Sequence, residues 1–210
     1  MPALSKQTIQ RLAVLHALAK WQKGAYGPVR LQKTLFFADK ESPPEWRLFT
    51  FKKWRLGQYS DEVSESLNAL RRAGRVNSWY DGPSERLKAE IPAASKRRLA
   101  AVLRDYFPEW SANLDAAFAK WAYLNNDAII ELAHDDPTYK ARNHGEVIFS
   151  SFEPDCVELV GLDDESAEEL SDLVDVRLQR GLAKRLAAAL ERPAQGEDWR
   201  KIYFAESHKS

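Results

Sequence analysis

The stretch Arg30–Asp39 reads RLQKTLFFAD, and its apolar residues recur at the spacing of one helix face. That face is made by Leu31, Leu35 and Ala38 and widened by Phe36 and Phe37. Pro28, just before the stretch, suits the first position of a helix, because its missing N–H would be unpaired there. The sequence therefore predicts a helix over residues 29–40 with a broad apolar face.

Another amphipathic helix is predicted on the N-terminal side, over Lys6–Lys23. Its apolar residues again have helical spacing: Ile9, Leu12, Leu15, Leu18 and Ala19. His16 lies near this face, and we interpret it as a core histidine. The glycines and proline of residues 24–28 separate the two helices.

On the C-terminal side, Arg47–Arg55 is rich in aromatic residues that alternate, which favours a strand or an extended segment. Ser60 is a good N-cap for the next helix, and Gly74 is a suitable stop for it. Residues 76–80 and 85–91 then flank Asp81–Ser84, which predicts a hairpin with a four-residue loop.

For the rest of the chain the sequence predicts mostly helices. One covers 96–106, with Ser95 as its N-cap, and others lie around 114–121 and 128–133. A long helix is predicted from Ser166 to Leu190, followed by a segment that docks through Trp199, Ile202 and Tyr203. We therefore expect a mainly α-helical α+β protein, with a winged-helix-like N-terminal half that contains a small β-hairpin and a helical C-terminal half.

Composition narrows the class of protein. The chain has 210 residues, of which 44% are hydrophobic and 30% charged, which excludes a wholly disordered chain. A single cysteine, Cys156, excludes an intramolecular disulfide and a cysteine-cage zinc site, and we interpret it as a small buried residue. The start of the chain is unlike a signal peptide and no apolar run has the length of a membrane span, so we expect a cytoplasmic protein with no membrane partner.

The net charge of zero conceals a gradient along the chain. Residues 1–59 contain 11 Lys and Arg against 3 Asp and Glu, whereas residues 151–210 contain 8 against 14. Such asymmetry fits an anionic partner for the basic end, attraction between the two ends, or two solvated faces.

No motif for nucleotide binding, metalloprotease activity or nucleophilic catalysis is present. The most metal-like group is His134, Asp135 and Asp136 together with His144. We interpret His134 instead as a capping or packing residue. The expectation is therefore a protein without catalytic activity, cofactor or metal.

The element order, two helices, a strand, a helix and a hairpin, resembles a winged helix, a fold that often binds DNA. Asp61, Glu62 and Glu65 lie on the first turns of the helix that would read the bases, where phosphates would repel them. A basic set on another face is an alternative contact for phosphates: Lys20, Lys23, Arg30, Lys33, Lys52, Lys53 and Arg55. A DNA-binding regulator is therefore the alternative function.

Three blocks of the sequence resemble the Panacea-domain, or SocA-like, antitoxin family. RLQKTLFFAD at Arg30–Asp39 is similar to its K-L-Q-K-L-L-Y-F-A signature. FKKWRLGQYSDEV at Phe51–Val63 resembles an aromatic strand leading to W-x-Y-G-P and a helix, with Gln58 where the family often has proline. LAHDDPTYKAR at Leu132–Arg142 resembles the block L-x-x-x-x-H-x-x-x-P-W-x-x-A-R, with Tyr139 in place of tryptophan.

The resemblance implies a Panacea-like domain over residues 5–150, followed by a C-terminal helical extension over 151–210. It also implies a noncatalytic antitoxin that neutralises a protein toxin, usually encoded by an adjacent gene, through direct contact. The predicted extension either covers the N-terminal domain or grips the toxin or a second copy of the chain.

We place the partner-binding patch at Lys33, Lys53, Trp54, Arg55 and Tyr59. Trp54 and Tyr59 flank Gly57, and cations stand beside the tryptophan. Tryptophan, tyrosine and arginine dominate the energetics of protein interfaces. The alternative is that both aromatic side chains pack into the core.

Overall fold

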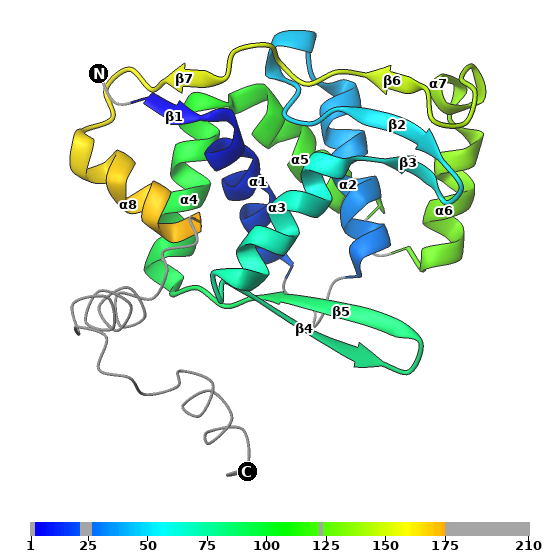
Figure 1. The fold of residues 1–210 in the computed structure, drawn as a ribbon, viewed down its shortest axis with the longest axis horizontal. Coiled ribbons are helices and arrows are strands. Elements are labelled where there is room, and N and C mark those ends of the chain that lie inside the picture. Colours follow the sequence, from blue (N-terminus) through cyan, green and yellow to red (C-terminus); the bar gives the residue numbers. More distant parts are fainter. Residues whose placement is uncertain (1–2, 22–26, 122–123, 175–210) are drawn as a thin grey trace, which may run out of the picture. The chain divides into compact units, whose positions relative to one another are not determined.

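Helix α1, Lys6–Lys20, lies among the other helices in Figure 1, and ten of its 15 residues are buried. The computed structural model describes residues 3–21, 27–121 and 124–174. By its contacts the chain divides into Met1–Val176 and Arg177–Ser210, and the second unit lies outside the described residues. The further helices are α2 Pro28–Glu41, α3 Asp61–Arg72, α4 Ala93–Tyr106, α5 Pro108–Trp121, α6 Asn126–Asp135, α7 Pro137–Lys140 and α8 Asp164–Val174.

Three small antiparallel sheets accompany these helices (Figure 1). Their strands are β1 Ala3–Ser5, β2 Phe51–Trp54, β3 Gly57–Tyr59, β4 Val76–Asp81, β5 Ser84–Ala89, β6 Val147–Phe149 and β7 Cys156–Glu158. The sheets are β1–β7, β3–β2–β6 and the β4–β5 hairpin. The expectation of a mainly helical α+β protein is therefore confirmed.

The two ends of α3 confirm the predictions that Ser60 is its N-cap and that Gly74 ends it. The N–H of Val63 donates to Ser60 Oγ at 3.3 Å, which satisfies one of the unpaired amides at the helix start. At the other end Gly74 has φ +67°, and the Arg75 N–H donates to the Leu70 carbonyl at 2.9 Å. This is the left-handed termination that glycine favours.

The predicted hairpin is present, but the prediction that its loop has four residues is wrong. Asp81 pairs with Ser84, so the turn contains only Gly82 and Pro83. Gly82 has φ +59°, and proline holds φ negative at the next position. That combination fits a type II′ turn, whose twist matches that of the strands.

Of the strand or extended segment predicted over 47–55, only Phe51–Trp54 forms a strand, β2. Leu48 and Phe49 donate their backbone N–H groups to the side chain of Asp39, at 3.1 and 2.7 Å. Amides bound to a carboxylate are not available to a strand ladder. The preceding residues, Pro44–Trp46, form a 3-10 helix.

Asp39 is fully buried and joins three segments. Besides the two amides, its carboxyl accepts the indole N–H of Trp110 on α5 at 2.6 Å. Burial raises the pKa of Asp39 to about 8, although the three donors act in the opposite direction. The end of α2, the approach to β2 and α5 are therefore held by one side chain.

Two further predictions need correction. Helix α4 begins at Ala93, so Ser95 lies in its first turn and is not its cap. Cys156 is exposed, not buried, because it lies in the two-stranded sheet of β1 and β7.

Residues 151–174 pack on the N-terminal elements. Strand β7 pairs with β1, and Leu170 and Val174 of α8 are buried in the common core. Of the predicted helix over 166–190, the structure describes α8 up to Val174. The remainder, and the predicted docking segment with Trp199, lie outside the described residues. In the described part of the chain, no helix has both the length and the apolar character needed to cross a membrane.

His16 is a core residue, as the sequence predicts. Its exposed fraction is 6%, and burial lowers its pKa to about 4, with Lys20 adding to the effect. The folded chain therefore keeps this histidine neutral well below the pH at which an unfolded chain protonates it.

Replacing Asp39 with alanine is expected to lower the free energy of unfolding by at least about 3 kcal/mol, because three buried N–H donors lose their acceptor. The matched control is Glu131→Ala, at an exposed residue of α6, which is expected to stay within about 0.5 kcal/mol of wild type. Urea denaturation measures both values. An Asp39→Ala loss below about 1 kcal/mol would contradict this role.

The stability difference between the wild type and His16→Gln is expected to depend on pH. Between pH 4 and 6.5 the unfolded state binds the proton more strongly, so the wild type gains stability as the pH rises through this window. The gain is about 3 kcal/mol and levels off above pH 6.5. Denaturation at several pH values measures it, and a difference that does not vary with pH would refute the neutral buried histidine.

Candidate functional site

The turn between β2 and β3 presents two large apolar side chains to solvent. Trp54 pairs with Gly57, so Arg55 and Leu56 form the turn itself. The exposed fractions of Trp54 and Leu56 are 43% and 45%. Two exposed apolar residues this close together are a feature of interaction surfaces.

Beside the turn, a largely apolar cavity of about 260 Å³ is lined by α2, β3 and the start of α3. Leu31, Val63 and Leu67 line it together with Trp54 and Leu56. Lys33 is the one charged residue among the residues that line it. The exposed side chains and the cavity are therefore parts of one site.

Lys33 is buried in this site, with an exposed fraction of 3%. Its Nζ donates to the backbone carbonyl of Gln58 at 2.5 Å. Burial lowers the pKa of Lys33 to about 7. Lys33 was predicted within a basic surface patch, and instead it lies under the β2–β3 turn, because α2 is buried on several sides.

Gly57 makes this close approach possible. Its φ is +95°, and a Cβ built on it would lie 2.8 Å from Lys33 Nζ and 3.1 Å from the Cβ of Ala133. Any larger residue would have to move the lysine as well as adopt a strained backbone. Glycine at position 57 is therefore a requirement of the buried lysine.

Gln58 ties the same strand to α6. Its side-chain Nε2 donates to the Ala133 carbonyl at 2.8 Å, and the residue is fully buried. Its Oε1 has no hydrogen-bond partner among the described residues. The amide of Gln58 thus makes a contact that a proline at this position has no group to make.

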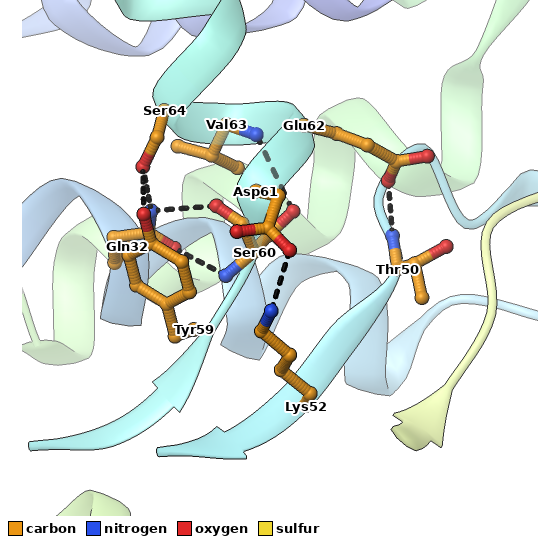
Figure 2. Close-up of polar contacts among 9 residues, drawn as sticks. All are labelled: Gln32, Thr50, Lys52, Tyr59, Ser60, Asp61, Glu62, Val63 and Ser64. Carbon is orange, nitrogen blue, oxygen red and sulfur yellow. Dashed lines mark hydrogen bonds and ion pairs between the residues drawn. The ribbon is translucent and has the colours of Figure 1, made fainter. Parts of the chain in front are cut away.

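Figure 2 shows how α2 holds the start of α3. The Gln32 amide accepts the Ser60 N–H at 2.9 Å and donates to the Ser60 carbonyl at 3.0 Å, as a neighbouring strand would. It also donates to Ser64 Oγ, which donates to the Tyr59 hydroxyl at 2.9 Å. Tyr59 is therefore half-buried and oriented by a polar network.

The acidic first turn of α3 is engaged within the chain. Lys52 pairs with Asp61 at 2.5 Å, and Glu62 accepts the backbone N–H of Thr50 at 2.5 Å (Figure 2). These contacts connect α3 to β2 from the side opposite Gln32. They fix the direction of the strand that carries Trp54.

Aromatic contacts surround the exposed tryptophan. The Trp54 ring lies 4.6 Å from the His144 ring and 6.2 Å from the Tyr59 ring, measured between centroids. The Tyr139 hydroxyl donates to the Trp54 carbonyl at 2.9 Å. Lys53 lies over the Tyr139 ring and donates to the Arg142 carbonyl. Arg55 is exposed.

The structure brings the five predicted site residues to one region, in different roles. Trp54 and Arg55 are exposed, Lys53 and Tyr59 are half-buried, and Lys33 lies beneath them. Sequence reasoning missed Leu56, Gln32 and the function of Gln58. The glycine at 57 is the one local signal of the turn that exposes Leu56.

The suspected metal group is not assembled in the described part of the chain. The His134 ring stacks on Tyr139 with 5.1 Å between centroids, and the His144 ring lies tilted against Trp54, so both histidines pack against aromatic rings. Among the described residues, no group of three or more His, Cys, Asp or Glu is suited to hold a metal ion.

No family model matches this chain, and no curated protein matches its sequence.

Gly57→Ala is expected to destabilise the chain more than Gly74→Ala, by at least about 1 kcal/mol. Both glycines have positive φ, but a Cβ at Gly74 meets nothing within 4 Å, whereas one at Gly57 meets Lys33 and Ala133. Gly74→Ala therefore isolates the backbone strain. Urea denaturation compares the two variants, and equal losses would mean that the close approach at Gly57 has no energetic weight.

Proposed function

We propose that this chain is a noncatalytic, antitoxin-like cytoplasmic protein that neutralises a partner protein by binding it. The observation that carries the proposal is the turn on which Trp54 and Leu56 are exposed beside an apolar cavity. A buried tryptophan or leucine side chain contributes roughly 1.5–3 kcal/mol in an interface, enough to anchor a complex.

The three blocks that resemble the Panacea family add support, because they are in contact in the fold. Lys33 of the first block donates to Gln58 of the second, and Gln58 donates to Ala133 of the third. Tyr139 of the third block donates to the Trp54 carbonyl. The three blocks that resemble this partner-binding family therefore meet beneath and beside the exposed turn, and their contacts hold it in place.

The mechanism we propose is occlusion. The exposed turn and the cavity bind an apolar element of the toxin. The cations beside Trp54 favour a toxin whose surface around that element is acidic. Electrostatic complementarity of this kind speeds association and selects partners. Neutralisation then needs no chemistry, only a complex that covers the toxin's active surface.

The second candidate function is a winged-helix-like DNA-binding regulator. It is suggested by the sequence in which α1, α2, α3 and the β4–β5 hairpin follow one another. The acidic first turn of α3 disfavours the usual docking, because Asp61 is largely exposed, with a side-chain exposure of 61%. Lys33 is too buried to contact a phosphate. These charges therefore favour the partner-binding hypothesis over DNA binding.

Co-expression with the product of the adjacent gene tests the proposal. We expect a stoichiometric complex after affinity purification, and relief of the growth arrest that the partner causes alone. Absence of both a complex and relief would contradict the antitoxin function.

The double variant Trp54→Ala/Leu56→Ala is expected to weaken that complex at least about thirtyfold, because two anchors are lost. The matched control is Tyr80→Ala/Val160→Ala, which removes side chains that are 75% and 71% exposed elsewhere. Titration calorimetry measures both affinities. Equal affinities for the two double variants would remove the turn from the interface.

A further inference from the structure

Lys33, one of the residues that line the cavity beside the β2–β3 turn, has an ammonium group whose bonding is incomplete. Lys33 Nζ carries three N–H donors when protonated. Within the described part of the chain its one hydrogen-bond partner is the Gln58 carbonyl. No carboxylate lines the cavity, so the lysine has no counter-ion there. A buried cation without a counter-ion is stabilised by any anion that reaches it.

The cavity walls define what else the ligand must carry. Leu31, Val63 and Leu67 form an apolar lining, and Trp54 and Leu56 stand beside it. A cavity of 150 Å³ lined by apolar side chains is enough for a benzene ring. The volume of about 260 Å³ therefore suits one ring or branched alkyl group together with a carboxylate.

The donors present favour a carboxylate over a phosphate. Lys33 supplies a single positive charge, and no arginine lines the cavity. A phosphate monoester carries close to two negative charges near neutral pH, which one ammonium does not neutralise, whereas a monocarboxylate carries one. The first turn of α2, at Pro28 and Val29, also lines the cavity, and its positive dipole end adds to the attraction for an anion.

We propose that this cavity is a binding site for a small monocarboxylate with an aryl or branched-alkyl body, whose carboxylate pairs with the Lys33 ammonium. The body fills the space between α2 and α3. The isolated chain contains all the residues that form this site, so ligand binding can be tested without the partner that the proposed function assigns to the same cavity. Binding would place the ligand directly under Trp54 and Leu56, the side chains assigned to the partner interface.

The probe is phenylacetate, and the neutral isostere phenylacetamide is its control. Titration of the full-length chain, followed by NMR chemical shifts and calorimetry, is expected to give saturable one-to-one binding of phenylacetate. Phenylacetamide is expected to bind at least about tenfold more weakly, because a charged hydrogen bond is replaced by a neutral one. Equal binding of the two compounds, or no binding of phenylacetate, would overturn the proposal.

Two variants separate the charge from the cavity. Lys33→Met is expected to lower the affinity for phenylacetate at least about tenfold, while Lys88→Met, at an exposed lysine of the β4–β5 hairpin outside the cavity lining, leaves it unchanged. Leu67→Phe fills the cavity without removing the ammonium, so it is expected to weaken the binding of both compounds. It replaces Lys33→Met as the test if that variant does not fold. Wild-type affinity in Lys33→Met, or in a folded Leu67→Phe, would overturn the assignment. Failure of the adjacent-gene experiment would leave these results unaffected.

Discussion

The buried carboxyl of Asp39 is the constraint on which the rest of the fold depends. It accepts N–H donors from Leu48, Phe49 and Trp110, so it fixes the end of α2, the approach to β2 and helix α5 against one another. Burial raises its pKa to about 8, a measure of how much the surroundings disfavour a charge there. The chain accepts that unfavourable burial because three otherwise unpaired donors need an acceptor.

The same helix that carries Asp39 also builds the candidate site. One turn and a half earlier, Lys33 holds β3 through the Gln58 carbonyl, and Gln32 holds the start of α3 through the Ser60 backbone. Helix α2 therefore positions β2 at one end and β3 at the other. The turn between these strands, with Trp54 and Leu56, is presented outward because both its strands are fastened to one buried helix.

Periodicity is enough to predict the helices, whereas the site depends on contacts between distant residues. The cap at Ser60 and the stop at Gly74 are local, and both were predicted correctly. Nothing local indicates that Asp39 binds the backbone amides of Leu48 and Phe49, so the sequence could not show where within 47–55 the strand begins. Lys33 was assigned to the surface because charge patterning cannot reveal that α2 is enclosed on most sides. The sequence left open whether the Trp54 side chain packs into the core or is presented at the surface, and in the structure it is exposed.

The most direct test of partner binding at the β2–β3 turn is hydrogen–deuterium exchange of the full chain, with and without the co-purified partner. We expect slowed exchange in β2, β3 and their turn, Phe51–Tyr59, and unchanged exchange in the β4–β5 hairpin, where Tyr80 is exposed. Protection confined to the hairpin, or to α8, would contradict it, because the partner would then be bound away from Trp54 and Leu56.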